Sequence, residues 1–429
     1  MYLNDTTNLN IKKLDVSTLV IGVDVAKYKS VARAFTIEGK EIGQAITFGT
    51  TFEGFNSFRA WIYEVRSKGN FSNTLVGMEP TGHYWFKIDE FVTESIDAAE
   101  AVIVGLSDVK SMRNLTGMKR KKTDHIDAMA IAQTIIFGRF STPNRRQNAF
   151  KDLREVVRFR EDKIHELVRL SNKAQGWLDL YFPEYHMVFA DWSCLSSIAI
   201  LQHYATPSEV NNTSEDIIFE KLRLQTKGSV GLKRIRHLKE VASKSISLNK
   251  CSEWSRYIFK EYISDYLRLQ EQVKFAEEKI TELLKRIEYA KNITGIKGLT
   301  PLAIASILSE TGDLNKYNSP KQLLSYAGLD LKINQSGTRQ GKTGISKRGS
   351  SRLRCLLFKF LLPVLYHDKT FLTLHKYYTQ REKNPLKRMQ SMIAIACKFL
   401  RTIYGIAKNN TIFDSSLVLK SKHIEFLAA

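Results

Sequence analysis

Two short, almost continuous apolar runs constrain the fold more than any other feature of the chain. Thr18–Val23 leads into Asp24, and Thr74–Met78 leads into Glu79 and a Pro-Thr-Gly turn. Runs of this length that are rich in Val, Ile and Leu are typical of strands buried on both faces of a mostly parallel sheet. We therefore expect Asp24 within one buried strand and Glu79 at the exit of another. A lone carboxylate in such a place is costly unless it is paired or bound to a metal.

The order of the predicted elements in the first third of the chain indicates a mixed α/β domain. Apolar and alternating patterns predict three strands within residues 18–48, with a turn at Glu38-Gly-Lys40. Helices and strands then alternate over residues 52–68, 74–79, 84–93 and 101–104. Three strands followed by such alternation are typical of a sheet of the ribonuclease H type.

Two further carboxylates stand at the predicted start of a helix. Asp124 and Asp127 follow Thr123, a residue type that is favoured as a helix N-cap. A spacing of three places both acids on the same helical face. Two like charges on one face repel each other unless a cation lies between them.

The four carboxylates Asp24, Glu79, Asp124 and Asp127 together predict a metal site. Mg²⁺ and Mn²⁺ prefer hard oxygen ligands, and two such ions about 4 Å apart can hold the attacking and leaving oxygens of a phosphoryl displacement. Each acid also has a structural interpretation when it is taken alone. An Asp at a helix start is usually a cap, and a Glu at a strand end is often only solvated.

The net charge predicts a polyanionic partner. Sixty-five Lys and Arg residues against 44 Asp and Glu residues give a charge of +21 and a pI near 9.6. Nucleic acid fits this charge best, because binding releases counterions, and a membrane surface is the weaker alternative. No basic leader followed by an apolar core, and no apolar run near 18 residues, favours export or a membrane span. We expect a cytoplasmic protein associated with the nucleoid.

The four cysteines argue against two kinds of small scaffold. They are far apart and include no C-x-x-C pair. This spacing is not typical of a zinc ribbon or of a disulfide framework.

Heptad seams predict two long helices in the middle of the chain. One seam lies within residues 151–181, and the other repeats every seven residues from Phe259 to Ile287. We expect these helices to pair, either within one chain or between two chains. The sequence therefore divides into an α/β domain over 1–150, a helical coiled-coil region over 151–291 with a helical insertion at about 183–250, and a mainly helical domain over 292–429.

Two basic segments are candidates for contact with nucleic acid. Residues 110–122 hold six basic residues and are expected to form a loop, and residues 332–354 hold seven basic residues and no acid. Such segments are also often merely solvated. The residues expected to bind nucleic acid are Lys119, Arg120, Lys121, Lys122, Arg339, Lys342, Lys347, Arg348 and Arg352.

The last third of the chain contains two further motifs. Residues 293–308 resemble a helix-hairpin-helix, whose Gly-rich turn lets backbone amides approach a phosphate. Ser336 precedes Gly within the second basic segment, and by its spacing alone Ser-Gly is usually only a turn. Ser346 is expected to be the N-cap, or a phosphate contact, of a helix that begins near residue 350.

Several of these motifs, taken in order, resemble those of a known family. They are Gly-Val-Asp24-Val-Ala-Lys, Glu79-Pro-Thr-Gly-His-Tyr, Lys-Thr-Asp124-His-Ile-Asp127-Ala, Tyr326-Ala-Gly-Leu, Gln-Ser336-Gly and Gly-Ile-Ser-Lys-Arg-Gly. The chain resembles the DEDD transposases of the "one-ten" class of bacterial insertion sequences, which are related to Piv-type DNA invertases. The resemblance covers nearly the whole chain.

This resemblance implies a function and a mechanism. The amino-terminal domain would be RuvC-like and would bind divalent metal through Asp24, Glu79, Asp124 and Asp127. The carboxy-terminal transposase domain would supply Ser336 as a nucleophile that forms a covalent 5′-phosphoserine link to DNA. A structured bridge RNA would pair with donor and target DNA. The protomers would assemble as a dimer to tetramer, with each active site shared between subunits.

Two other classes of function remain open at this point. In a metal-dependent RuvC-like nuclease or Holliday-junction resolvase, water would attack and the carboxy-terminal domain would only bind. A non-catalytic packaging protein would account for the charge but not for the four acids.

Overall fold

The structure is a computed structural model that describes residues 14–116, 123–143, 148–226, 231–248, 251–332, 335–336, 339–340, 344–420 and 423. The chain divides into two compact units, residues 1–145 and residues 146–429, and each is described by itself. The first is a mixed α/β unit, and nearly all of the regular structure in the second is helical.

The first unit is built on a five-stranded sheet with the strand order β3-β2-β1-β4-β5. β1 pairs antiparallel with β2 and parallel with β4, and the β4–β5 pair is also parallel. The predicted order of three strands followed by alternation is confirmed. The strands span Thr18–Asp24 (β1), Lys29–Phe35 (β2), Ile46–Gly49 (β3), Asn73–Met78 (β4) and Ala99–Ile103 (β5).

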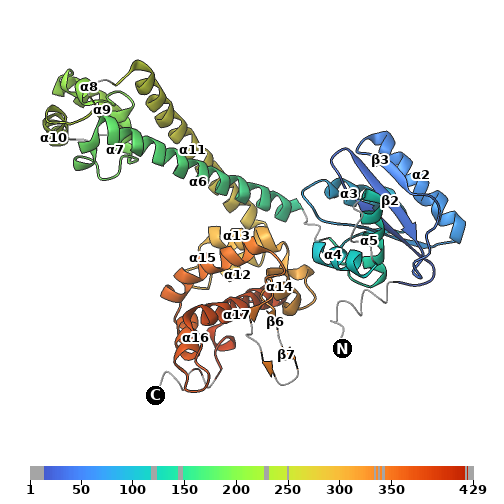
Figure 1. The fold of residues 1–429 in the computed structure, drawn as a ribbon. Helices are drawn as coiled ribbons and strands as arrows, with labels where there is room; N and C mark the ends of the chain where they lie inside the picture. Colours follow the sequence, from blue (N-terminus) through green and yellow to red (C-terminus); the bar gives the residue numbers. More distant parts are fainter. Residues whose placement is uncertain are drawn as a thin grey trace. The chain divides into compact units, whose positions relative to one another are not determined.

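Helices cover both faces of this sheet (Figure 1). Apolar side chains of α2 and α3 form one core layer with alternate residues of β1 and β4. Side chains of α4 and α5 form the other layer with the remaining alternate residues. The helices span Phe52–Gly69 (α2), Trp85–Ser95 (α3), Leu106–Leu115 (α4) and Asp124–Ile136 (α5).

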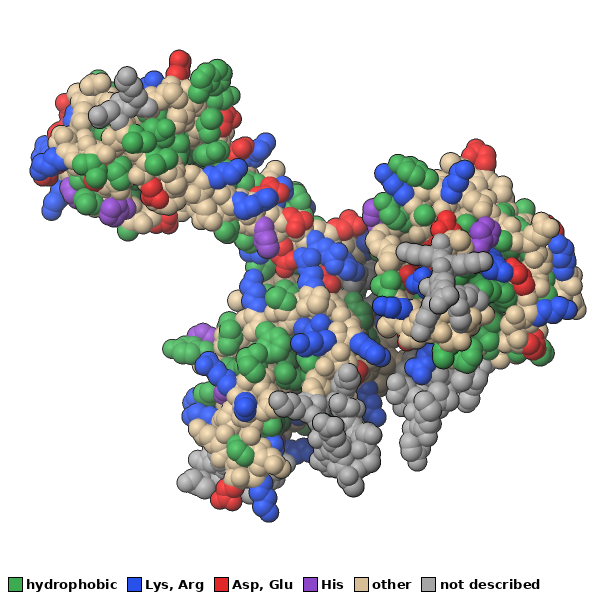
Figure 2. Space-filling model, in the orientation of Figure 1, with side chains coloured by type: hydrophobic (Ala, Val, Ile, Leu, Met, Phe, Trp, Pro, Cys, Tyr) green, Lys and Arg blue, Asp and Glu red, His purple; other side chains and the backbone are tan. Residues whose placement is uncertain are grey.

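Two long helices in the second unit, α6 (Asn148–Tyr181) and α11 (Glu253–Lys285), lie side by side (Figure 1). The ring of Trp177 stacks on that of Phe259 with 4.0 Å between the ring centroids. An ion pair joins Arg160 to Glu277 at 2.6 Å. The predicted pairing of the two seams therefore occurs within one chain, and acidic and basic side chains are interspersed along the pair (Figure 2).

Short helices fill the segment between α6 and α11. They surround a separate core in which the Tyr185 hydroxyl lies 2.9 Å from the Ser197 hydroxyl. Burial raises the pKa of Tyr185 well above its ordinary value. The elements are η2 (Pro183–Met187), α7 (Leu195–Leu201), α8 (Pro207–Asn211), α9 (Glu215–Thr226) and α10 (Leu232–Ser243).

The remaining helices pack around another core, the largest among the described residues of this unit. This core also contains Phe150, Leu153 and Val157 from the first turns of α6. Since α6 contributes to two cores, the division at residue 291 stays a prediction. The elements are α12 (Ala290–Ile293), α13 (Pro301–Thr311), η3 (Leu314–Lys316), α14 (Pro320–Ala327), β6 (Leu331–Lys332), β7 (Gln335–Ser336), β8 (Arg339–Gln340), β9 (Gly344–Ile345), α15 (Ser351–His367), α16 (Lys369–Gln380), α17 (Arg388–Asn409) and η4 (Ser415–Leu417).

None of the helices in the described ranges combines the length and the apolar character that crossing a membrane requires. All four cysteines lie in the described ranges, and each is a free thiol.

Candidate functional site

The first two predicted carboxylates lie at the ends of neighbouring parallel strands. Asp24 is the last residue of β1, and Glu79 comes directly after Met78, the last residue of β4. Val23 lies opposite Met78 in the register of the two strands. Because parallel strands end at the same edge of a sheet, the two acids leave the sheet side by side.

Both acids continue the face of the sheet that α5 covers. Val20 and Leu75 belong to the core layer beside α5. Asp24 lies four residues after Val20, and Glu79 lies four residues after Leu75. Since side chains alternate between the two faces, Asp24 falls on the same face as Val20, and Glu79 falls on the same face as Leu75.

Two glycines let α5 approach this face very closely. A Cβ atom at Gly22 would lie 2.0 Å from the Ala128 carbonyl oxygen and 2.6 Å from the Ala132 nitrogen. At Gly77, a Cβ would lie 2.1 Å from the Ile135 side chain. Neither glycine was among the predicted site residues, although a glycine inside a β-branched run is a signal of close backbone approach.

The other two acids begin α5. The predicted N-cap is confirmed, because the Thr123 hydroxyl accepts a hydrogen bond from the Ile126 amide. Asp124 lies one turn before Ala128, the residue that meets Gly22, and is exposed, whereas Asp127 is half-buried. Two of the four acids thus lie at the edge of the sheet, and the other two lie in the first turn of the helix that covers it.

An arginine holds the start of α5 against the sheet. The Arg33 guanidinium donates to both oxygens of Glu41, at 2.7 and 2.6 Å, and to the His125 carbonyl oxygen at 3.0 Å. This contact was not predicted, since no local pattern in the sequence connects residues 92 positions apart.

A second arginine contacts one of the four acids directly. The Arg113 guanidinium donates to Asp127 Oδ1 at 2.8 Å, and both side chains are largely shielded from water. Arg113 lies in α4, so the prediction of a loop over residues 110–122 is wrong up to Leu115. The apolar contacts of Val109 and Met112 with the core stabilise this helix in spite of its basic residues.

The four acids are suitable donors for a divalent cation, because hard carboxylate oxygens on rigid elements are what Mg²⁺ and Mn²⁺ prefer. Within the part of the chain that the structure describes, no three His, Cys, Asp or Glu residues are grouped closely enough to hold a metal ion. The metal quartet therefore stays a prediction.

The predicted serine lies in the second unit, on a two-residue strand. Ser336 of β7 pairs antiparallel with Arg339 of β8. The side chains of Ser336 and Arg339 are outside the described part of the chain. Residues 119–122 and Lys342, which were also predicted to bind nucleic acid, lie outside the described residues altogether.

The two motifs that flank this serine pack against each other. The Gly328 carbonyl accepts from the Lys347 amide at 3.0 Å, and the Tyr326 carbonyl accepts from the Ser350 amide at 2.8 Å. A Cβ at Gly349 would lie 2.4 Å from the Tyr326 oxygen. The Lys347 side chain is exposed, as is that of Arg348, so both are available to a polyanion.

The N-cap of α15 differs from the prediction. The hydroxyl of Ser350 accepts from the Leu353 amide at 3.1 Å and caps the helix. Ser346 instead accepts a local hydrogen bond from the Arg348 amide at 3.3 Å. The cap lies four residues later because the segment between them pairs with the motif around Gly328.

Arg352 forms an internal ion-pair cluster, which we call the Glu310 cluster. Its guanidinium pairs with Glu161 of α6 and lies 3.5 Å from Glu310 of α13. Glu310 is only 3% exposed and also pairs with Arg158 at 3.0 Å and with Arg154 at 3.6 Å. The Glu310 cluster thus connects α6, α13 and α15, a role of Arg352 that no local pattern in the sequence indicated.

The turn that resembles a helix-hairpin-helix is packed within the protein. Gly298 has a φ of +83°, and a Cβ there would lie 2.5 Å from the Pro363 carbonyl oxygen. The Lys297 amide donates to Asp368 Oδ2 at 3.1 Å. The Lys297 amide of this turn is therefore already hydrogen-bonded to a carboxylate of the protein itself.

Two family models match the chain. The model for DEDD transposases of the IS110 type, described as "Transposase", matches residues 21–183. The model described as "Transposase IS116/IS110/IS902 family" matches residues 290–378. The first match contains the four acids, and the second contains Ser336.

Several proteins of bacterial insertion elements are similar to this chain. An "Insertion element IS116 uncharacterized 44.8 kDa protein" of Streptomyces clavuligerus is 24% identical over 68% of this chain and 72% of its own length. The "Pilin gene-inverting protein" of Moraxella lacunata is 27% identical over 37% of this chain and 50% of its own. The "Transposase for insertion sequence element IS1111A" of Coxiella burnetii is 29% identical over 25% of this chain and 29% of its own.

Proposed function

Since the chain belongs to the IS116/IS110/IS902 family of insertion-sequence transposases, we propose that it cuts and rejoins DNA through a covalent serine intermediate, guided by RNA. The enzyme is a DNA transposase. The observation that best supports the proposal is the sheet edge in the first unit, where Asp24 ends β1 and Glu79 directly follows the parallel strand β4, on the face that α5 covers. We assign this unit to the RuvC-like, ribonuclease H type because three strands come first along the chain and helices then alternate with strands.

The proposed strand cleavage is a transfer of one phosphodiester linkage to the protein. The Ser336 oxygen attacks phosphorus, a serine–phosphate bond forms at the 5′ end, and the bond from phosphorus to the 3′ oxygen breaks. The proton lost by the serine balances the proton gained by the leaving 3′ oxygen. In the reverse step a 3′ hydroxyl attacks the phosphoserine, so that rejoining requires no ATP.

Asp24, Glu79, Asp124 and Asp127 would hold the divalent metal, Mg²⁺ or Mn²⁺. When bound, such a metal lowers the pKa of an attacking hydroxyl and offsets the negative charge on the phosphate. Exposed Lys347 and Arg348 would bind the backbone of the nucleic acid near Ser336.

The proposed partners are donor DNA, target DNA and a structured bridge RNA that pairs with both. The charge of +21 supports this assignment, because sequence would be recognised by base pairing while the protein neutralises phosphates. We further propose that a dimer or tetramer combines the acids of one subunit with Ser336 of another, and that the protein acts in the cytoplasm at the nucleoid.

Trapping the protein–DNA adduct tests the serine. Purified protein is incubated with guide RNA and labelled donor and target DNA, then denatured and separated by electrophoresis. We expect the adduct in the wild type, its loss in Ser336→Ala, and its retention in Ser346→Ala, a matched serine of the same segment. An adduct that persists in Ser336→Ala would remove this residue from the role.

The same gel tests the alternative of a water-dependent nuclease. Free cleaved ends made equally well by Ser336→Ala would favour attack by water. We expect Asp24→Asn, and excess chelator with the wild type, to abolish both adduct and product. A calorimetric titration with Mn²⁺ should show weaker metal binding in Asp24→Asn, which separates a metal defect from a general loss of activity.

A further inference from the structure

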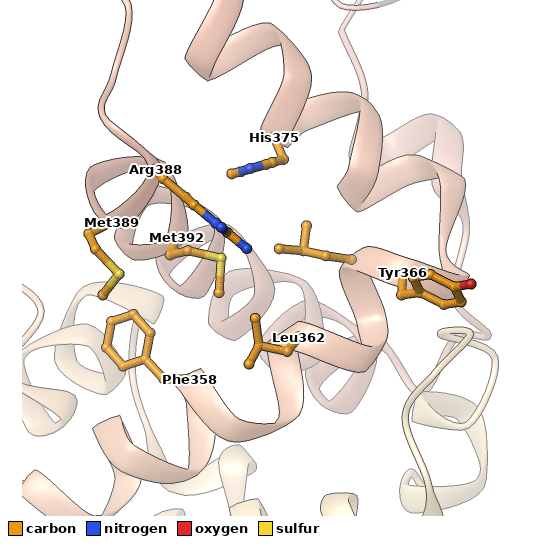
Figure 3. A pocket seen from close by; sticks show the side chains of 8 residues that line it. Phe358, Leu362, Tyr366, His375, Arg388, Met389 and Met392 are labelled. Atoms are coloured by element: carbon orange, nitrogen blue, oxygen red, sulfur yellow. The ribbon is translucent and has the colours of Figure 1, made fainter.

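A cavity of about 570 Å³ lies between α15, α16 and α17 of the second unit (Figure 3). Its walls are formed mainly by Phe358, Leu362, Met389 and Met392. Leu362 is 56% exposed and Met389 is 62% exposed, so the apolar wall is open to solvent on one side. An open apolar cavity of this size with few polar groups is typical of a ligand site.

Two polar side chains reach this cavity. The guanidinium of Arg388 extends over the apolar walls, and the His375 ring points toward them from α16 (Figure 3). His375 Nδ1 is hydrogen-bonded to the Ser391 hydroxyl at 2.9 Å, which orients the ring and turns Nε2 away from Ser391. Burial, together with the charge of Arg388, lowers the pKa of His375 and so favours the neutral ring.

The helices around the cavity are free of acidic residues. α15, α16 and α17 contain three, two and four Lys or Arg residues and no Asp or Glu. Between α15 and α16, the carboxylate of Asp368 is buried and accepts from the amides of Lys297 and Thr370. In the face seen in Figure 2, basic and apolar side chains likewise dominate this part of the unit.

We propose that this cavity binds one unpaired base of a single-stranded nucleic acid, with the adjoining phosphate at Arg388. This inference rests on the proposed function in one respect, namely that the chain acts on nucleic acid. A base is a flat, mostly apolar ring with hydrogen-bonding edges, and it is joined to a negative phosphate. The apolar walls, the neutral His375 ring and the Arg388 guanidinium match these three properties in turn.

Charge decides between a base and an apolar helix of a partner protein. The cavity would also accommodate apolar side chains, since methionines adapt to many shapes. A partner protein, however, gains little from the Arg388 guanidinium and from surrounding helices that carry no acidic residue, whereas a phosphate next to a bound base gains from both.

Site-specific crosslinking tests the proposal. The probes are single strands of about ten nucleotides, of RNA and of DNA, each with one central 5-iodouridine or its deoxy form. After irradiation of the full-length protein, mass spectrometry locates the crosslinked residue. We expect crosslinks at Phe358, His375 or Met389, and loss of about tenfold in yield in Leu362→Glu and in Arg388→Gln. The RNA and DNA arms identify which strand the cavity prefers.

Ile412→Glu is the matched control, because it places the same charge on another exposed apolar residue of the same unit, 73% exposed. It should keep the crosslink, and circular dichroism should show that all three variants are folded. Each probe is also tested after annealing to its complementary strand. Crosslinks elsewhere, an equal yield with this duplex, or an altered oligomeric state in Leu362→Glu with the crosslink retained would each overturn the proposal. If the protein recombines DNA but gives no crosslink in this cavity, the proposed base site is wrong and the proposed function is unaffected. If the crosslink forms but the protein–DNA adduct is unchanged in Ser336→Ala, the serine mechanism is wrong and the base site is unaffected.

Discussion

Two regions of the molecule hold candidate functional groups in place by opposite means. In the first unit, α5 rests on β1 through backbone contacts at Gly22, where even a methyl group would collide with Ala128 and Ala132. In the second unit, the Glu310 cluster joins α6, α13 and α15 through charges around a carboxylate that is 3% exposed.

This difference shows which changes each region tolerates. The contact of α5 with the sheet contains no charge at Gly22, so it is sensitive to added atoms and insensitive to salt. The Glu310 cluster leaves its arginines partly exposed, so it tolerates changes of size at its edge but depends on its central charge.

The largest effect is expected for Gly22→Val. The added side chain must push α5 away from β1, and we expect a loss of more than about 3 kcal/mol in the free energy of unfolding together with loss of transposition. Urea denaturation measures the first and an excision assay the second. Gly176→Ala is the control, because nothing lies within 4 Å of that helical position, and it should gain about 0.5 to 1 kcal/mol. Equal stability of Gly22→Val and wild type would refute the close contact.

A smaller loss, of about 2 kcal/mol, is expected for Glu310→Gln. Removing the charge leaves three guanidinium groups without their shared partner, although their partial exposure reduces the cost. Glu282→Gln is the matched control, since that carboxylate also pairs with two cations but is exposed on α11, and its effect should be much smaller. An equal loss in the free energy of unfolding in both variants would show that the Glu310 cluster stabilises the protein no more than an exposed ion pair does.

Ser350→Ala should cost about 1 kcal/mol, because the amide of Leu353 loses its cap. Ser346→Ala, which removes only a local hydrogen bond, should cost less. Thermal unfolding measures the loss of Tm in each of the two variants. A larger loss in Ser346→Ala than in Ser350→Ala would indicate that Ser346 is the N-cap.

The smallest effect concerns pH. Because burial lowers the pKa of His375 in the folded protein, the unfolded chain binds a proton there more readily. The free energy of unfolding should therefore be highest above about pH 6.5 and should decrease slightly as the pH falls below that value. His375→Gln should flatten this part of a plot of Tm against pH, whereas His367→Gln, at an exposed position on α15, should not. An unchanged slope in His375→Gln would contradict the prediction.

Local patterns in the sequence predicted most elements of the described fold. The apolar runs before Asp24 and Glu79 became β1 and β4, and Thr123 became the cap of α5. Both heptad seams became helices that pair. These succeeded because strand burial, capping and seam formation each depend on residues that are close along the chain.

The errors arose where distant residues decide the conformation. The basic composition of residues 110–122 suggested a loop, yet the apolar residues Val109 and Met112 anchor α4 to the core. Ser346 had the right residue type for an N-cap, but the segment after it pairs with the motif around Gly328, and Ser350 caps α15 instead.

The sequence by itself determined the residue types of the candidate site, the strands and helix that carry the four acids, and the family to which the chain belongs. Only the tertiary structure decided that Arg113 pairs with Asp127, that Arg352 is drawn into the Glu310 cluster, and that three helices leave an apolar cavity beside Arg388. The physical reason is the distance along the chain between the residues that interact. Strand and helix formation depend on neighbours along the chain, whereas ion pairs and cavities depend on which side chains the completed packing brings together.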